Sequence, residues 1–333
     1  MKVFIHYQTK SRADAFEGYR LRKTLKGACE AMDVAWVDNL ASQPDIAHFI
    51  SSRDAGLALK LKEGGTKIVC SAFYCENDAY ASFLDHKNGE IRLSEKGLKM
   101  LSIADLVLVP NQTMKDFALA SGVKKRIEIH APGVNLARFD PKLPEKKIFP
   151  RYFRVRPSER YFVAIGNYED KDTLNAIRQI APLCPQFRFY FFGTDSFGRV
   201  ANIKRRFIQR HCPENLVLQP IVDDDVYRSA LMNASGYLLL DDDHPDTVGL
   251  LDAFAAKAPI FVLGDQKYND ALIPGENCYQ GKDVVSLVKA IADYYRIEDK
   301  TTIIAGLNYA KSRSLEKFGQ ELIAYYQSLI QQD

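Results

Sequence analysis

The chain of 333 residues is longer than one ordinary hydrophobic core supports and has about the size of two domains. With 47% hydrophobic and 26% charged residues its composition is that of a globular protein. It has no run of about 20 apolar residues that would span a membrane, and its start, MKVFIHYQTK, lacks the hydrophobic region of a signal peptide. We therefore expect a cytoplasmic protein, with any membrane contact peripheral.

The net charge of +3 is unevenly divided along the chain. Residues 1–150 hold 23 Lys and Arg against 18 Asp and Glu, whereas the remainder holds 22 against 24. This asymmetry indicates that the first half meets something anionic, such as a membrane surface or an acidic acceptor. Chance variation in surface charge explains it equally well. Nucleic acid is not expected as a partner.

Short apolar runs alternate with stretches of helical length in the first half of the chain. Strands are predicted at 2–6, 34–37, 46–50, 67–72, 105–109 and 126–131, and helices at 13–32, 53–63, 92–102 and 112–121. Strands this apolar, separated by helices, predict a parallel sheet that is covered on both faces. Residues 141–157 interrupt the pattern with four prolines and a run of basic and aromatic side chains, so we predict a linker there.

The alternation restarts after this stretch. Strands are predicted at 161–165, 187–192, 216–219, 236–240 and 259–263, and helices at 174–181, 203–211, 224–232, 248–256 and within 302–331. The pattern predicts an α/β protein with two Rossmann-like domains, 1–145 and 158–310, whose parallel sheets face each other across a cleft. A C-terminal helix in 311–333 is expected to cross back to the first domain.

The six cysteines form no C-x-x-C pair, so their spacing predicts neither a zinc site nor a disulfide framework. Free thiols are expected. No metal or other cofactor is expected.

A polar cluster marks the junction between a strand and a helix in residues 236–262. The side chains that follow the strand directly are Asp241, Asp242, Asp243 and His244. One residue near Thr247 suffices to cap the helix, so capping does not account for the whole cluster. Because helix N-termini bind phosphate and carboxylates accept hydrogen bonds from sugar hydroxyls, the segment predicts a nucleotide-sugar site.

This segment resembles the signature of the group-1 (family 4) retaining GT-B glycosyltransferases, in which seven residues separate two glutamates. Residues 251–255 (LDAFA) and 258–260 (API) match its second half. Asp252 takes the place of the second glutamate, which holds the nucleotide ribose in that family. His244, with Asp243 beside it, takes the place of the first, which contacts the donor sugar near the reacting carbon.

Other motifs of the same family follow the chain at the expected places. Residues 127–135 (IEIHAPGVN) and 138–141 (RFDP) resemble the stretch that closes the family's first domain. The resemblance implies a donor site made of Gly18, Gly166, Asn167, Lys171, Thr247, Val248, Gly249 and Asp252. In it Lys171 acts as a point charge on the diphosphate, and Asn167 stands where the family has an arginine. An ordinary surface lysine is the alternative for Lys171.

The first domain resembles that of bacterial glycolipid glycosyltransferases over residues 46–48 and 68–78. We expect His48, Phe73 and Glu76 on the acceptor side, with a structural role as the alternative for His48. A basic helix and the basic-aromatic linker favour a lipid acceptor at an anionic membrane, although a solvated basic face looks the same. The cations of that helix are Arg20, Arg22, Lys23 and Lys26.

The resemblance implies transfer of a hexose from a nucleoside-diphosphate sugar, expected to be a UDP-sugar, to a glycolipid or glycan acceptor. The anomeric configuration would be retained, and no metal would be needed at the diphosphate. Both motif glutamates and the arginine are replaced in this sequence. A catalytically impaired GT-B-like binding or partner subunit is therefore the alternative interpretation. A sugar epimerase on the same fold is a third possibility.

Overall fold

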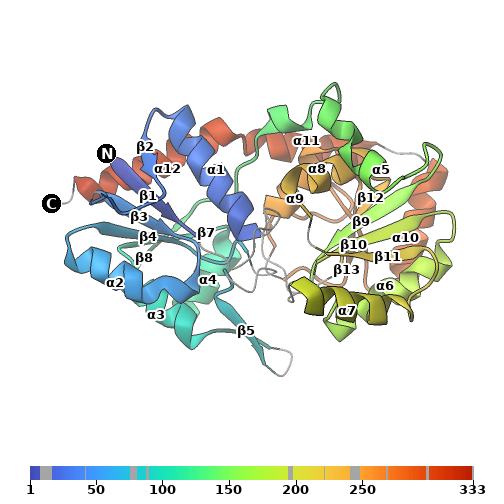
Figure 1. The fold of residues 1–333 in the computed structure, drawn as a ribbon, viewed down its shortest axis with the longest axis horizontal. Coiled ribbons are helices and arrows are strands. Elements are labelled where there is room, and N and C mark those ends of the chain that lie inside the picture. Colours follow the sequence, from blue (N-terminus) through green and yellow to red (C-terminus); the bar gives the residue numbers. More distant parts are fainter. Residues whose placement is uncertain are drawn as a thin grey trace.

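The computed structural model describes residues 1–7, 17–41, 43–75, 81–87, 90–193, 198–220, 222–240, 248–267, 269–297 and 300–331. Figure 1 shows two α/β halves side by side, each built around its own sheet, with the blue to green half on the left and the green to orange half on the right. The C-terminal helices, in red, run along both halves. The chain thus passes from the first half to the second and back to the first.

Six parallel strands form the N-terminal sheet, in the order β2-β1-β3-β4-β7-β8. They are β1 (Lys2–His6), β2 (Ala35–Val37), β3 (Ile46–Phe49), β4 (Lys67–Ser71), β7 (Leu106–Val109) and β8 (Arg126–Ile129). All side chains of β3 and β7 are buried, as in parallel strands covered by helices on both faces. The helices described around this sheet are α1 (Glu17–Ala31), α2 (Ala55–Glu63), α3 (Glu95–Ile103) and α4 (Gln112–Ala120), with a 3₁₀ turn η1 (Ser52–Asp54) before α2.

The C-terminal sheet is also parallel and has the order β11-β10-β9-β12-β13-β14. Its strands are β9 (Tyr161–Ile165), β10 (Arg188–Phe192), β11 (Leu216–Gln219), β12 (Gly236–Leu239), β13 (Ile260–Leu263) and β14 (Tyr279–Gly281). In β10, Phe189 and Phe191 pack on one face of the sheet while Tyr190 and Phe192 pack on the other, and all four are buried. The helices of this half are α6 (Lys171–Leu183), α7 (Gly198–Gln209), α8 (Asp224–Asn233), α9 (Val248–Ala255) and α10 (Val284–Ile297).

Several helices begin at a side chain that satisfies their first free amide groups. The Asn111 side chain accepts a hydrogen bond from Met114 N at 2.8 Å at the start of α4, and Asp170 accepts one from Thr173 N at 3.2 Å at the start of α6. Both capping residues come soon after a strand, so α4 begins shortly after β7 and α6 shortly after β9.

Several segments differ from the sequence-based prediction. The helix expected from residue 92 begins only at Glu95, because Glu90–Leu93 form β6, which pairs with β5 (Leu84–Lys87) in an antiparallel hairpin. The Asn88-Gly89 dipeptide in the sequence is a hairpin signal that helical periodicity does not detect. β14 was not predicted because Tyr-Gln-Gly is too short and polar to stand out as a strand. The helix α10 was also not predicted.

The predicted linker is folded onto the C-terminal half. It contains a 3₁₀ turn η3 (Pro144–Lys147) and the short helix α5 (Ile148–Tyr152), and both contact α8. Phe149 is fully buried against Tyr161 and Tyr190, with ring centroids 5.2 Å and 5.0 Å away, and its amide donates to Ser229 Oγ at 2.9 Å. The aromatic side chains of this stretch therefore belong in part to the core.

The last helix returns to the N-terminal half. α11 (Thr301–Ser312) contacts α9, and α12 (Leu315–Ile330) packs along α1. Phe318, Leu322 and Tyr326 of α12 are buried in the N-terminal core. Within the described parts of the chain, every helix is too short or too polar to cross a lipid bilayer. The six cysteines are free, and five of them are buried.

Candidate functional site

Each parallel sheet has one point at which the strand order reverses, and loops that leave the sheet there diverge to opposite faces. In the C-terminal sheet this point lies between the paired strands β9 and β12. Gly166 follows β9, and the polar cluster that precedes α9 follows β12. Such switch points are where α/β sheets bind ligands.

The turn after β9 is built from two glycines in close contact. Gly166 has φ 156° and Gly193, at the end of the neighbouring β10, has φ 136°. A Cβ atom on Gly193 would lie 1.7 Å from Gly166 O, which only glycine avoids. The Asn167 side chain then accepts a hydrogen bond from Glu169 N at 2.9 Å. Lys171 is exposed at the first position of α6, so the predicted Gly166, Asn167 and Lys171 share one tight turn at the switch point.

The helix that follows β12 carries three of the predicted donor residues. Val248, Gly249 and Asp252 all belong to α9, in which every residue is buried. Four predicted residues lie outside the described part of the chain: Asp243, His244, Thr247 and Glu76. The geometry of the site is therefore defined by α9 and by the turn after β9.

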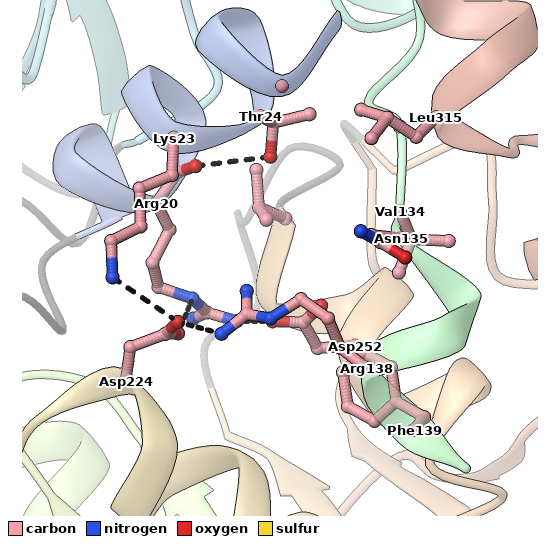
Figure 2. A pocket seen from close by; sticks show the side chains of 13 residues that line it. Arg20, Lys23, Thr24, Val134, Asn135, Arg138, Phe139, Asp224, Asp252 and Leu315 are labelled. Carbon is pink, nitrogen blue, oxygen red and sulfur yellow. Dashed lines mark hydrogen bonds and ion pairs between the residues drawn. The ribbon is translucent and has the colours of Figure 1, made fainter. Parts of the chain in front are cut away.

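Asp252 meets a cation from the other half of the molecule. The Arg20 side chain of α1 forms a salt bridge with the Asp252 carboxylate, and only 2% of that side chain is exposed. Gly18, another predicted donor residue, lies two residues earlier in α1 and is buried, but it does not line the cavity described below. Figure 2 shows Arg20 reaching across from α1 toward α8 and α9.

A cavity of about 340 Å³ lies at this meeting point. α1, the segment 133–139, α8, α9 and the start of α12 contribute to its wall: Arg20, Lys23, Thr24, Gly27, Gly133, Val134, Asn135, Arg138, Phe139, Asp224, Val248, Asp252 and Leu315. Figure 2 shows Lys23, Arg20 and Arg138 converging on Asp224, with Asp252 close by. Both halves of the molecule therefore shape the cavity.

Asp224, at the start of α8, is the acid at the centre of this cluster. Arg20 Nε lies 3.6 Å and Lys23 Nζ 3.7 Å from its carboxylate oxygens, and Arg138 also forms a salt bridge with it. Burial opposes ionisation of Asp224, but the surrounding cations outweigh burial and hold its pKa below the ordinary value. The cluster is thus charged at neutral pH and links the two halves of the molecule.

The basic helix does not present the free cationic face that its sequence indicated. Arg20 is buried against Asp252, and Lys23 faces Asp224. Arg22 and Lys26 both pair with Asp38, at 2.5 Å and 2.7 Å. Because all four cations have acidic partners within the protein, the prediction that this helix attracts a membrane is not supported.

The two described residues predicted on the acceptor side lie in the protein interior. His48 is fully buried between Tyr326 Oη, 2.5 Å from its Nδ1, and Ser71 Oγ, 2.7 Å from its Nε2. Phe73 is fully buried against Phe83 and Phe117, with φ 70°. The geometry of His48 is that of a structural histidine, the alternative that its sequence position left open, and neither side chain lines the cavity.

Two buried histidines make the stability of the fold depend on pH. Burial, with a contribution from His130, lowers the pKa of His48 to about 3. Burial lowers the pKa of His130 to about 4, although a hydrogen bond to Phe318 O opposes this. An unfolded chain takes up these protons near pH 6.5, so between that pH and its folded-state pKa each histidine destabilises the folded state by about 1.4 kcal/mol per pH unit.

We therefore expect these two histidines to lower the free energy of unfolding by roughly 3–4 kcal/mol from pH 6.5 to pH 5. Urea unfolding followed by circular dichroism at a series of pH values measures this slope. His48→Gln should reduce the slope by about half, whereas His211→Gln, at an exposed histidine, should change it little. An unchanged slope in His48→Gln would contradict the assignment.

Comparisons with known proteins agree on the fold. No protein-family model matches the chain. Its sequence is 25% identical over 231 residues to a processive diacylglycerol alpha-glucosyltransferase of Acholeplasma laidlawii, a match covering 68% of this chain and 69% of that protein. The Anabaena protein Alr3699/HepE in complex with UDP-glucose superposes with a TM-score of 0.70 at 12% identity, covering 98% of this chain and all of that one. Sucrose-phosphate synthase from Thermosynechococcus elongatus gives a TM-score of 0.67 at 15% identity, covering 98% and 82%.

The chain has the GT-B fold. Its resemblance to the retaining GT-B glycosyltransferases, predicted from the motifs, is confirmed by these comparisons. In this GT-B chain the first domain contributes Arg20 and the second contributes Asp224 and Asp252, so the charge cluster joins the two domains. Among the described residues, no group of His, Cys, Asp or Glu side chains is placed to hold a metal ion.

Sequence reasoning missed the role of Arg20, Arg138 and Asp224 in this GT-B chain. Arg20 and Asp252 are 232 residues apart, and their pairing depends on how two separately folded domains meet. The sequence marked Arg20 as basic and Asp252 as a binding residue, but no local pattern joins them.

Proposed function

We propose that the protein is a retaining glycosyltransferase that moves a hexose from a UDP-sugar to a lipid or glycan acceptor. The observation that carries the proposal is that the two predicted donor segments follow the adjacent strands β9 and β12, at the switch point of the second GT-B domain. The similarity to a named alpha-glucosyltransferase and to a structure that holds UDP-glucose supports it.

In this proposal the turn after β9 receives the donor diphosphate. The glycines at 166 and 193 let the backbone come close to the phosphates, and Lys171 supplies a positive charge at the first turn of α6. Stabilising the leaving diphosphate in this way supplies the electrostatic part of catalysis. Asn167 holds the turn in shape through its bond to Glu169 N.

The remaining donor contacts are assigned to α9 and the segment before it. Asp252 would accept hydrogen bonds from the ribose hydroxyls, with Thr247, Val248 and Gly249 bringing the start of α9 against the donor. His244 and Asp243 would face the transferred sugar. Closure of the two domains would exclude water, which otherwise competes with the acceptor.

The acceptor is proposed to be a lipid, held on the first domain at the inner face of a membrane. The name of the Acholeplasma relative, a diacylglycerol alpha-glucosyltransferase, supports a lipid acceptor. Because His48 and Phe73 are buried, other residues of the first domain have to contact it.

Ligand-induced stabilisation tests the donor assignment. UDP-glucose should raise the midpoint of thermal unfolding, because a ligand that binds only the folded state at 100 times its Kd contributes about 2.7 kcal/mol. GDP-glucose and ADP-glucose serve as comparisons. Lys171→Ala should weaken UDP-glucose binding by about tenfold, the loss of one charge-assisted contact, and leave uridine binding unchanged.

Lys311→Ala, an exposed lysine of α11, is the matched control and should bind UDP-glucose as the unmodified protein does. Equal UDP-glucose affinity of the Lys171→Ala and Lys311→Ala variants would reject the role of Lys171. If no nucleotide sugar raises the unfolding midpoint, the donor assignment as a whole fails.

One observation favours a second candidate, a GT-B-like binding or partner subunit without transferase activity. Asp252, which would hold the ribose, is already engaged by Arg20. A donor would have to share or displace that cation. The two candidates differ in turnover: a transferase releases sugar from UDP-glucose in the presence of acceptor, whereas a binding subunit leaves the donor intact.

A further inference from the structure

One helix of the second domain presents apolar side chains to solvent in a continuous stripe. Val200, Ile203 and Phe207 of α7 are 61%, 62% and 64% exposed. Residues three and four apart lie on the same face of a helix, so these three side chains form one stripe along α7. Exposed apolar residues scattered singly are ordinary, but a contiguous stripe marks an interaction surface.

The stripe is bordered by cations. Arg206 and Arg210 follow Ile203 and Phe207 by three residues and lie along one edge, and both are exposed. Lys204 lies on the other edge and pairs with Glu169 at 2.9 Å. Among the described residues, neither Arg206 nor Arg210 has an acid within salt-bridge distance, and the sequence of α7 contains no Asp or Glu.

Side chains on the opposite side of α7 attach the helix to the domain. Arg205 Nη1 donates to Leu218 O at 3.1 Å, Gln209 Nε2 donates to Leu216 O at 2.7 Å, and Ile208 packs against the second-domain core. The attachment orients the helix, so that the apolar stripe faces away from the body of the domain.

We propose that α7 docks the protein on an anionic lipid surface, with Val200, Ile203 and Phe207 inserted among the acyl chains and Arg206 and Arg210 at the lipid phosphates. An apolar stripe edged by basic residues, on a helix without acids, is the pattern of helices that lie in a membrane interface. Each cation near an anionic bilayer adds to the attraction, and each buried apolar side chain adds hydrophobic free energy.

A second copy of the chain fits this surface less well. Pairing α7 with itself would bring Arg206 and Arg210 of two chains together, and like charges across an interface are repulsive. Three apolar side chains also cover far less area than the roughly 1,200–2,000 Å² of a stable protein interface. An anionic bilayer complements both the charge and the small apolar area.

The position of α7 suits a membrane-bound acceptor. In Figure 1, α7 and the β5–β6 hairpin lie at the lower edge of the two domains, whereas α11, which joins them, lies at the top. A bilayer at the lower edge would therefore be near both domains. The biological purpose of docking rests on the proposed lipid acceptor, but docking itself requires neither donor nor acceptor.

Sedimentation of the full chain with phosphatidylcholine vesicles, with and without phosphatidylglycerol, tests the proposal without any sugar substrate. We expect binding only to vesicles that contain phosphatidylglycerol, and less binding at high salt. Replacing Val200, Ile203 and Phe207 together by serine should lower the partition coefficient by about tenfold or more, as should Arg206→Gln with Arg210→Gln. The matched control replaces the equally exposed but scattered Val285, Ile297 and Ile304 by serine and should bind as the unmodified protein does.

A fluorescent probe reports the same contact directly. Trp36 is the single tryptophan, so Phe207→Trp in a Trp36→Phe background places the only indole on the stripe. Its emission should shift to the blue with phosphatidylglycerol vesicles and not with phosphatidylcholine alone. Absence of binding to anionic vesicles, or unchanged binding of the serine variant at 200, 203 and 207, would overturn the proposal. So would a loss of dimers in that variant without lipid, which would assign the stripe to a second copy.

Discussion

Replacing Arg20 by methionine is expected to lower the free energy of unfolding by about 3–5 kcal/mol, the cost of breaking a buried ion pair from one side. The Arg20 side chain is 2% exposed, contacts Asp252 and Asp224, and stacks over the Tyr227 ring with its guanidinium 4.7 Å from the centroid. Methionine keeps much of the apolar volume but removes the charge. Asp224 retains Arg138 and Lys23, whereas Asp252 loses the cation that compensates its burial.

Urea unfolding measures this effect, and Arg22→Met in the same helix is the control. Arg22 pairs with Asp38, whose side chain is 49% exposed, so its loss should cost at most about 1 kcal/mol. A difference below about 1 kcal/mol between the two variants would show that the salt bridge to Asp252 does not hold the domains together.

A double-mutant cycle separates the pair from its surroundings. Asp252→Leu alone leaves Arg20 with Asp224, while the double variant Arg20→Met with Asp252→Leu replaces the pair by apolar side chains. Because a buried pair replaced by hydrophobic residues is often neutral or stabilising, the double variant should recover much of the stability lost in Arg20→Met. The same variants report on ligand binding: if Asp252 holds the ribose, both Asp252→Leu variants lose affinity for UDP-glucose even where stability is recovered.

Local sequence patterns predicted the strands in which nearly every side chain is buried. β9 was predicted with its observed bounds, 161–165, because it consists of five consecutive apolar residues and Gly166 follows directly. The same reasoning failed where contacts distant in sequence decide the structure. The proline-rich stretch around Phe149 looks like a linker, but Phe149 fills a space between Tyr161 and Tyr190 that only the folded second domain creates.

In the candidate site too, residues positioned by neighbouring elements could be predicted, whereas residues positioned by contacts distant in sequence could not. Gly166 and Lys171 are placed by the strand and the helix next to them, so a motif of a few residues was enough to put both in the turn between β9 and α6. For His48 the sequence left a catalytic and a structural role open, and its environment is set by Tyr326, 278 residues later. α7 was predicted as a helix from 203 to 211, but its apolar stripe was not singled out. Its periodicity is also that of a helix facing a core, and only the exposure of Val200, Ile203 and Phe207 distinguishes the two.

Gly193→Ala is expected to destabilise the second domain by more than about 4 kcal/mol, because a steric clash adds to an unfavourable backbone conformation. Gly193 has φ 136°, and a Cβ atom there would approach Gly166 O to 1.7 Å. The oxygen belongs to the backbone, so no side chain rotation relieves the contact. Gly166 would have to move, together with the hydrogen bond from its amide to Phe192 O, which is 3.0 Å long.

Gly275→Ala in the same domain separates the clash from backbone strain. Gly275 has φ 81°, and no atom lies within 4 Å of its added Cβ, so its replacement should cost only about 1–2 kcal/mol. UDP-glucose binding, measured well below the unfolding midpoint, should be lost in Gly193→Ala and kept in Gly275→Ala, because only the former displaces the turn that leads to Lys171. If the two variants are equally stable and bind the nucleotide sugar equally, the contact between Gly166 and Gly193 does not shape the donor site, and the phosphate-binding role of this turn has to be abandoned.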